Sequence, residues 1–231
     1  MGATIEGRQC GSFGDYSAIS YNGNKIITGS SGGCFLTNNI ETANQIRKWS
    51  TQARENAPWY QHEVVGYNYR MSNVVAGVVR GQYTYLEEHI AQKKAIYERY
   101  CEGFSNLPVK MNPIVAGTDP NYWLSAMIID PDYMCKQVRT DCQAKYVKEK
   151  GKTCPTEILE TLAKYNVEGR PIWKPMHMQP IYQKHAFVTR GGDRVDVGAD
   201  IFERGLCLPS DNKMTAQEQA KVIEIVRSCF E

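Results

Sequence analysis

The sequence predicts a mixed α/β fold, and three features of its patterning support that prediction. Short apolar runs separated by glycines fill residues 1–40, as in brief strands joined by turns. Apolar residues recur at three- and four-residue steps over residues 73–104, which predicts one long helix connecting two domains, with its aromatic stripe packed in the core. An apolar run containing a tryptophan at residues 122–129 predicts a further strand.

The N-terminal half is expected to pass from strands to a helix and then to a polar loop. The apolar runs at 16–21 and 34–36 predict two strands. Residues 40–56 place apolar side chains on one side and charged ones on the other, which predicts a helix that ends before Pro58. Residues 66–72 are polar and aromatic, and we expect a loop there.

The C-terminal half is expected to hold shorter helices. Residues 136–152 are charged and aperiodic, which favours an insertion or an exposed helix without catalytic weight. Helical spacing predicts amphipathic helices at 156–165 and 195–204, the second of which ends at residues 206–210. Residues 215–218 (TAQE) form the pattern of a capping box, which predicts the start of the last helix.

Composition and charge exclude several classes of function. The 231 residues allow one large domain or two modest ones. The formal net charge is only +2 and no basic stripe alternates with aromatics, so we expect no nucleic-acid partner. No apolar run approaches the roughly 20 residues that span a bilayer, and no secretory signal is evident. The eight cysteines lack metal-ligand spacing, so we expect no metal site and buried, reduced thiols in a cytoplasmic protein.

Lys25 lies between two predicted strands and beside a glycine-rich loop, in the run SYNGNKIITGSSGG at residues 20–33. A lysine held among backbone amides and small hydroxyls suits an amine that forms a Schiff base with a phosphate-bearing aldehyde. An exposed hairpin turn is the alternative, because Asn-Gly is a common turn signal. The spacing alone favours the turn.

Four motifs, in order, make the chain resemble the DegT/DnrJ/EryC1/StrS family of pyridoxal-phosphate-dependent sugar-nucleotide aminotransferases. They are GSFGD at 11–15 with the lysine run, GYNYRM at 66–71, RPIWKPMHMQP at 170–180 and FERGLCLPS at 202–210. The third motif most resembles the branch that acts on UDP-linked 4-keto-6-deoxy-N-acetylhexosamines. The resemblance runs from about residue 2 to the end of the chain.

The resemblance implies the C-terminal part of a type I aminotransferase fold, with the end of the large cofactor domain at residues 1–85 and the small α/β domain at 86–231. In the family, a large segment precedes the lysine and supplies the aromatic that stacks on the cofactor and the carboxylate facing its pyridinium nitrogen. We therefore expect a C-terminal piece of such an enzyme, truncated or completed by a second polypeptide.

The resemblance implies three contacts with pyridoxal 5′-phosphate. Lys25 matches the lysine that forms the Schiff base, an amine that also moves a proton during amino transfer. Ser20 matches the hydroxyl that binds the cofactor phosphate, and a local hydrogen bond is the alternative. Asn68 matches an asparagine that reaches the phosphate in a neighbouring subunit, which implies a homodimer, and an Asx-type turn is the alternative.

Substrate contacts are implied at three further positions. Arg70 matches a residue that can bind the nucleotide diphosphate through its planar guanidinium, with a surface ion pair as the alternative. His177 resembles a histidine on the sugar side of the pocket, with a structural role as the alternative. Arg170 begins the same motif and has a weaker claim to contact substrate. Gly32 and Gly33 are expected to serve backbone geometry.

The implied activity is transfer of an amino group, from glutamate, to a 4-keto-6-deoxy nucleotide sugar for cell-surface polysaccharide or glycan synthesis. A non-catalytic assembly module, which pairs with a separately encoded N-terminal half, is the alternative. A dehydratase of the same family is disfavoured, because those enzymes carry histidine where this chain has Lys25.

Overall fold

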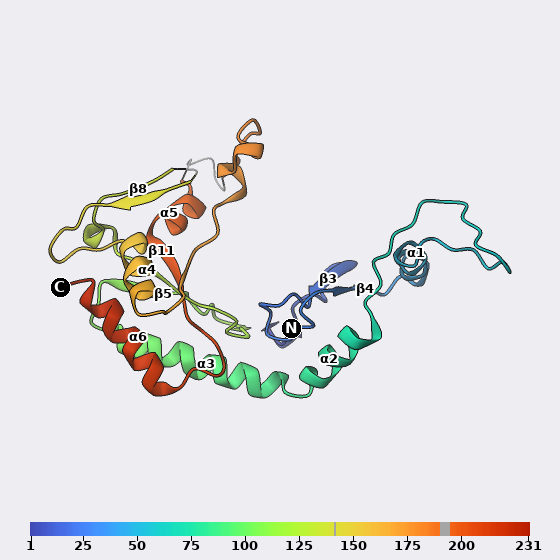
Figure 1. Ribbon diagram of the computed structural model, residues 1–231, viewed down its shortest axis with the longest axis horizontal. Coiled ribbons are helices and arrows are strands. Elements are labelled where there is room, and N and C mark those ends of the chain that lie inside the picture. Colours follow the sequence, from blue (N-terminus) through green and yellow to red (C-terminus); the bar gives the residue numbers. More distant parts are fainter. Residues whose placement is uncertain (141, 190–194) are drawn as a thin grey trace. The chain divides into compact units, whose positions relative to one another are not determined.

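The computed structural model describes residues 1–140, 142–189 and 195–231, which form two compact units (Figure 1). The first unit contains residues 1–91 and 114–123, and the second contains 92–113 and 124–231. Helices and strands occur in both, which confirms the mixed α/β class. Their assignment to a large and a small domain that divide at residue 85 stays a prediction.

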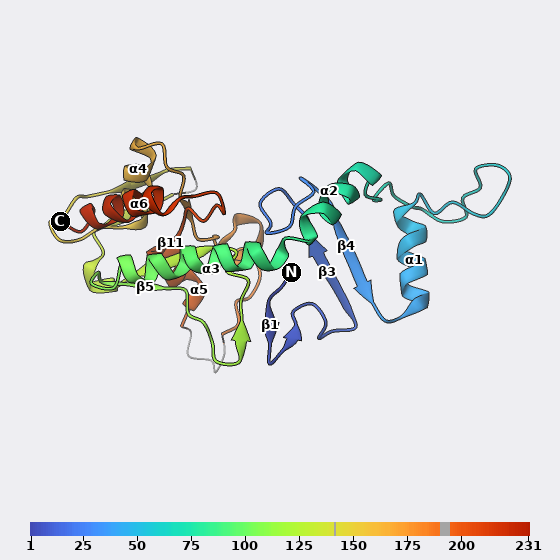
Figure 2. The same cartoon turned by 90° about the horizontal axis from the view of Figure 1, so that it is seen from below.

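The strands of the first unit form two small antiparallel sheets. In one, β1 (Thr4–Ile5) lies between β2 (Arg8–Gln9) and β6 (Thr118–Asp119). In the other, β3 (Tyr16–Ser20) pairs with β4 (Gly33–Thr37), and Figure 2 shows these two strands side by side. The hairpin confirms both strands predicted on either side of the lysine.

Two glycines at the end of the loop allow β4 to pair with β3. Gly32 has a φ of +91°, a conformation that side chains with a Cβ rarely adopt. A Cβ on Gly33 would lie 2.6 Å from the carbonyl oxygen of Ile19 on the neighbouring strand. Both positions therefore require glycine for backbone reasons, in agreement with the sequence expectation.

The first helix follows the hairpin. Helix α1 (Ile40–Ser50) begins where the side chain of Asn39 accepts a hydrogen bond of 2.9 Å from the backbone N–H of Thr42. The helix predicted for residues 40–56 is confirmed, but it ends at Ser50, well before Pro58. Thr51 ends it with a backbone hydrogen bond to the carbonyl of Lys48.

The single long helix predicted for residues 73–104 is wrong, because the chain forms α2 (Asn73–Tyr83) and α3 (Leu86–Gly103) instead. Thr84 Oγ1 donates to the carbonyl of Gly81 (3.0 Å), and the N–H of Tyr85 bonds to the carbonyl three residues earlier (2.9 Å). These tight local bonds replace the regular helical ones and interrupt the helix. The apolar spacing continues through the break, which explains the error.

The aromatic and aliphatic stripe of these helices is only partly core. Tyr97 and Phe104 on α3 are buried, as predicted, and Tyr100, which the predicted stripe does not include, is buried as well. Val78 on α2 is 47% exposed and Tyr85, between the two helices, is 55% exposed. Core packing is therefore the correct interpretation for the C-terminal part of the stripe and the wrong one for Val78 and Tyr85.

A four-stranded antiparallel sheet forms the centre of the second unit. Its order is β10 (Arg170–Pro171), β11 (Gly205–Leu208), β7 (Ser125–Ile129) and β5 (Val109–Met111). The strand predicted at 122–129 is confirmed but begins at Ser125. The segment expected only to end a helix is the fully buried strand β11.

Helices α4 (Pro155–Lys164), α5 (Val197–Arg204) and α6 (Ala216–Ser228) confirm the three short helices predicted in the C-terminal half. None of the helices among the described residues is long and apolar enough to cross a membrane. Short 3₁₀ helices lie at Pro131–Tyr133, Met176–Met178 and Pro180–Tyr182.

The charged segment 136–152 is a hairpin of β8 (Gln137–Arg139) and β9 (Ala144–Tyr146), so the expected exposed helix is wrong. Its inward side chains bind the end of α5. The side chain of Gln137 donates to the carbonyl of Glu203 (2.6 Å), and the guanidinium of Arg139 donates to the carbonyl of Phe202 (2.6 Å). These long-range bonds stabilise an extended backbone in a segment whose apolar residues show no helical or strand periodicity.

Helices α3 and α6 run side by side in the second unit in both cartoon views (Figures 1 and 2). The buried side chain of Gln219 on α6 donates to the carbonyl of Ile96 on α3 (2.7 Å), and Arg227 donates to the carbonyl of Gly103 (2.7 Å). The fully buried core between the helices and the sheet contains Ile96, Tyr100, Phe104, Met127, Ile129, Ile158, Leu162, Leu206, Leu208, Val222 and Val226.

Thr215 begins α6 with the predicted capping box. Its hydroxyl accepts from the N–H of Glu218 (3.2 Å), and the Glu218 carboxylate accepts from the N–H of Thr215 (2.8 Å). We expect Thr215→Ala to lower the free energy of unfolding by about 1 kcal/mol in urea titrations, because one cap donor loses its acceptor. Thr215→Ser keeps the acceptor and is the control. An unchanged midpoint in Thr215→Ala would contradict the role of this cap.

All eight cysteines are free thiols. Cys135, Cys154 and Cys207 are buried, as the sequence suggests, whereas Cys10 and Cys142 are exposed. Burial of the thiols as a class was therefore the wrong expectation for these two.

Candidate functional site

Lys25 lies in a compact turn that follows β3. Its N–H donates to the carbonyl of Asn22 (3.0 Å), and the N–H of Gly29 donates to the carbonyl of Tyr21 (2.9 Å). Tyr21 in turn donates its N–H to the carbonyl of Gly32 (2.9 Å), which closes the base of the loop. The backbone is thus a turn whether Lys25 is a Schiff-base amine or an exposed turn residue. The surroundings of its side chain distinguish these two interpretations.

The Lys25 ammonium lies over an indole ring. Its Nζ is 4.2 Å from the centroid of the Trp123 ring, a cation–π arrangement. Trp123 Nε1 also donates to the carbonyl of Asn24 (2.6 Å), so the indole contacts both the lysine and the backbone beside it. Lys25 is accordingly part-buried and directed rather than extended into solvent.

A cavity of about 390 Å³ brings Lys25 and Ser20 together within the first unit. A primary amine and a hydroxyl in one cavity fit a cofactor that carries an aldehyde and a phosphate, since an amine can bind the first and a hydroxyl the second. The volume lies in the range of small-molecule sites, about 300–1,000 Å³. The remaining lining comes from Met1, Cys10, Gly11, Ala18, Ile19, Ile26, Ile27, Asn121 and Trp123.

Ser20 ends β3 and is exposed. Its hydroxyl accepts a hydrogen bond of 3.3 Å from the N–H of Asn22. The local bond that the alternative interpretation predicts is therefore present. The hydroxyl proton remains available to an acceptor such as a phosphate oxygen, because a hydroxyl both accepts and donates.

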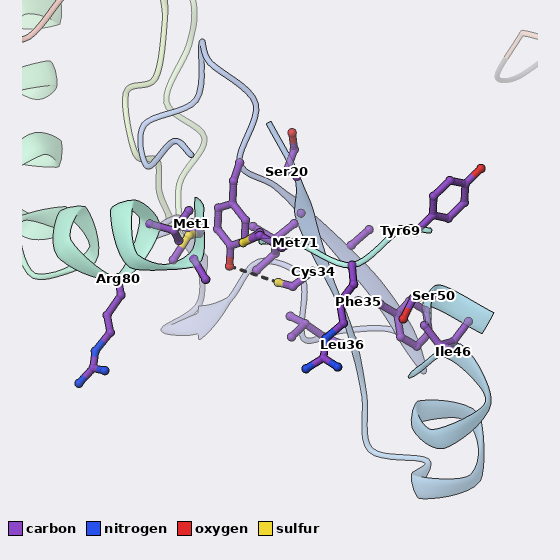
Figure 3. A pocket seen from close by; sticks show the side chains of 18 of the residues that line it. Met1, Ser20, Cys34, Phe35, Leu36, Ile46, Ser50, Tyr69, Met71 and Arg80 are labelled. Atoms are coloured by element: carbon purple, nitrogen blue, oxygen red, sulfur yellow. Dashed lines mark hydrogen bonds between the residues drawn. The ribbon is translucent and has the colours of Figure 1, made fainter. Parts of the chain in front are cut away.

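A second, larger cavity of about 1260 Å³ also has Ser20 in its wall and adds Arg70. Figure 3 shows apolar side chains of β4, among them Phe35 and Leu36, in the wall of this cavity together with Tyr69. Tyr69 stacks on Tyr67, with ring centroids 5.0 Å apart. Arg70 is exposed, so its guanidinium is accessible to an anionic group.

Tyr21 is another polar group in the wall of the larger cavity. A hydrogen bond of 3.3 Å joins its hydroxyl to Cys34 Sγ (Figure 3). Burial and, secondarily, the contact with Cys34 raise the pKa of Tyr21 to about 12. The Tyr21 hydroxyl therefore stays protonated at neutral pH and contributes no charge to this cavity.

Asn68 lies outside the lining of both cavities among the described residues. Its backbone pairs with Thr51 in an isolated antiparallel bridge, which the N–H of Tyr69 reinforces by donating to the carbonyl of Ser50 (3.0 Å). Successive side chains of an extended segment point to opposite sides, so Asn68 faces away from Tyr67 and Tyr69. The exposed amide is thus not brought to the Lys25 of the same chain.

His177 lies in the second unit, in the 3₁₀ turn Met176–Met178. Its Nε2 is 2.6 Å from Oδ2 of Asp196, and its ring stacks on Phe187 with centroids 3.9 Å apart. Asp196 also accepts the N–H of Ala199 through Oδ1 (2.8 Å) and so caps α5. That backbone N–H, with the His177 contact adding to it, lowers the pKa of Asp196.

Arg170 pairs with β11 through its backbone and with Glu168 through its side chain. The guanidinium donates from Nε (3.0 Å) and Nη2 (2.8 Å) to one oxygen of Glu168. The side chains of both residues are about two-thirds exposed or more, at 66% and 74%. An exposed pair of this kind contributes little stability, about 0–1 kcal/mol. Substrate contact by Arg170 stays a prediction.

Sequence reasoning did not assign a role to Trp123 or Asp196. Trp123 reaches Asn24 across 99 residues of chain, and no local pattern indicates such a contact. Asp196 has the sequence signal of a helix cap, being an acidic residue just before an amphipathic helix. Its second oxygen, which binds His177, has no such signal.

Residues 1–227 match the DegT/DnrJ/EryC1/StrS aminotransferase family. The chain is 36% identical over its whole length to EpsN of Bacillus subtilis, provisionally named as a pyridoxal phosphate-dependent aminotransferase, and covers 54% of that protein. It is 26% identical to the GDP-perosamine synthase of Vibrio cholerae, again over its whole length and over 57% of the relative. The chain thus spans about half the length of the curated relatives it matches.

Solved structures of similar fold include Spr1654 of Streptococcus pneumoniae in its pyridoxal-phosphate form. The TM-score is 0.78 at 18% sequence identity, over 99% of this chain and 55% of that one. This likeness confirms that the chain has the C-terminal portion of the aminotransferase fold. From the family match and the 36% identity to EpsN, the chain belongs to the DegT/DnrJ/EryC1/StrS aminotransferase family.

Proposed function

We propose that this chain carries the lysine and phosphate side of a pyridoxal-phosphate-dependent sugar-nucleotide aminotransferase. One observation supports the proposal above the others: in a chain of this family, the amine-bearing Lys25 and the hydroxyl-bearing Ser20 line the same cavity of about 390 Å³. The amine would bind the cofactor covalently, and the Ser20 hydroxyl would donate to its phosphate.

Each residue then has a defined task. Pyridoxal phosphate, when bound, supplies the electron sink that carbanion chemistry at the substrate requires. Lys25 Nζ would move a proton between the reacting substrate carbon and C4′ of the cofactor, because a primary amine on a flexible stem can reach both atoms. The Trp123 ring stabilises the ammonium whenever the amine is free and protonated.

The substrate is proposed to be a 4-keto-6-deoxy sugar linked to a nucleoside diphosphate, UDP by preference, with glutamate as amino donor. Arg70 is exposed at the larger cavity and can bind diphosphate oxygens in a paired manner. His177 would contact the sugar. The name of one relative, GDP-perosamine synthase, supports an amino sugar as product and keeps the nucleotide open to test.

Asn68 is proposed to serve a second subunit. Its amide is exposed and lies outside the cavities of its own chain, as expected for a side chain that reaches a neighbouring site. The working assembly would then be a homodimer, or a complex with a polypeptide that supplies the rest of the fold, in the cytoplasm. Sedimentation equilibrium of the wild-type chain and Asn68→Ala tests the first form.

The activity is tested by isotope transfer. The chain is incubated with pyridoxal phosphate, ¹⁵N-glutamate and 4-keto-6-deoxy sugars linked to UDP, GDP or dTDP, and the products are analysed by mass spectrometry. We expect ¹⁵N in the amino sugar from the UDP substrate. Glutamine in place of glutamate is the donor control.

Incorporation only from GDP or dTDP sugars would contradict the proposed nucleotide. No incorporation from any sugar, in a chain that still binds the cofactor through Lys25, would contradict amino transfer by this polypeptide. That outcome would favour the alternative of an assembly module.

A further inference from the structure

The side chain of Asp196 does more than a helix cap requires. A cap needs one acceptor oxygen for a backbone N–H in the first turn, and Oδ1 serves Ala199 at 2.8 Å. Oδ2 is left over, and it lies 2.6 Å from Nε2 of His177. Serine, threonine or asparagine would cap α5 as well, so the cap explains one oxygen of the carboxylate and not the other.

The start of α5 is packed against the turn that carries His177. A Cβ on Gly198 would lie 3.4 Å from Cγ of Pro175, so the helix approaches this turn closely. The turn itself is fixed by backbone bonds from Met178 to Pro175 (3.0 Å) and from Gln179 to Met176 (3.1 Å). The carboxylate and the histidine are therefore carried by two segments that pack against each other.

Phe187 fixes the plane of the imidazole. Its ring lies 3.9 Å from the His177 ring, with 23° between the planes. With the plane fixed by stacking and Nε2 held by Asp196, the ring has one remaining polar atom, Nδ1. Among the described residues, no hydrogen bond to Nδ1 is found. Nδ1 is also not one of the buried side-chain atoms that lack a partner, so it is accessible to a ligand.

An ionised carboxylate only accepts hydrogen bonds, so the proton of the neutral imidazole must lie on Nε2. The lone pair is then on Nδ1. We propose that Asp196 is a positioning residue that holds His177 in the Nε2–H tautomer and so presents Nδ1 as the acceptor for a hydroxyl or amide N–H of the sugar. The role toward the sugar rests on the proposed function, whereas the tautomer does not.

Imidazole ¹⁵N spectra of the full chain test the tautomer without cofactor or substrate. The four histidines are distinguished by His177→Gln, which removes one set of signals. We expect neutral His177 to carry its proton on Nε2. In Asp196→Asn the amide can cap α5 through its oxygen and donate through its NH₂, so the proton should move to Nδ1.

Asp196→Ser is the matched control. Serine keeps the cap but is too short to hold Nε2, so we expect a mixture of tautomers at an unchanged urea midpoint. A wild-type ring with its proton on Nδ1, or an Asp196→Asn ring that keeps it on Nε2, would overturn the inference. A purely structural role of Asp196 would move the midpoint and leave the tautomer unchanged.

The isotope-transfer assay tests the role toward the sugar. Asp196→Asn should raise KM for the nucleotide sugar about fivefold, the effect of losing one hydrogen bond of about 1 kcal/mol, with adduct formation at Lys25 unchanged. An unchanged KM despite a moved proton would overturn the sugar contact alone. Loss of transfer in the wild-type chain contradicts the proposed function, while the spectra still decide the tautomer.

Discussion

Replacing Lys25 with alanine is expected to abolish covalent capture of pyridoxal phosphate at this site. Lys25 carries the only side-chain amine among the described residues that line its cavity, and a side-chain amine is the group that forms a Schiff base with the aldehyde. The wild-type chain should show the absorbance of the adduct on mixing, and borohydride should fix the label on the peptide that contains Lys25. In Lys25→Ala, labelling should fall to the background of the exposed lysines.

Two controls separate chemistry from folding and from non-specific labelling. Lys25→Arg keeps a cation above Trp123 but lacks a nucleophilic amine, so the fold should persist without the adduct. Lys94→Ala removes a lysine whose side chain is 53% exposed, and the adduct at Lys25 should be unchanged. An absorbance band that survives in Lys25→Ala would show that another residue holds the cofactor.

Tyr100→Ala is expected to destabilise the second unit by about 3–5 kcal/mol, the cost of removing a large buried aromatic side chain. Tyr100 is fully buried, stacks on Phe104 with centroids 5.6 Å apart and donates to the carbonyl of Pro209 (2.8 Å). The variant loses the ring and leaves that carbonyl without its donor. The free energy of unfolding, measured in urea by circular dichroism, checks the value.

Tyr100→Phe isolates the hydroxyl. The ring and its stacking remain, and only the bond to Pro209 is lost, so we expect about 1 kcal/mol. Tyr165→Ala, at a side chain that is 66% exposed, should change stability by less than about 0.5 kcal/mol. Equal effects of Tyr100→Ala and Tyr165→Ala would contradict the placement of Tyr100 in the core.

Local sequence signals predicted the elements that local bonds fix. The capping box at Thr215 marked the start of α6, and apolar runs marked β3 and β4. Elements that depend on contacts between residues distant in sequence were not predicted. The hairpin β8–β9 depends on bonds from Gln137 and Arg139 to the end of α5, which no window of neighbouring residues contains.

The residues of the candidate site likewise fall into those that a local motif predicts and those that depend on long-range contacts. Lys25 and Ser20 are five residues apart in one motif, so the sequence alone predicts that they lie close together, and they line the same cavity. The roles of Trp123 and Asp196 could not be predicted from the sequence, because each acts through a contact with a residue distant in sequence. The break between α2 and α3 was hidden for another reason: the tight local bonds at Thr84 and Tyr85 interrupt the helix without disturbing the apolar spacing.

The path of the chain between the units has a practical consequence for dissecting the protein. Residues 114–123 return to the first unit after 92–113 have entered the second, so the backbone crosses the boundary three times. Excising everything after residue 91 would separate β6 from β1, the strand with which it pairs, and Trp123 from Lys25. Neither unit can therefore be expressed as one continuous stretch of the natural sequence. Expressing the first unit alone would require a short peptide linker between residues 91 and 114 in place of residues 92–113.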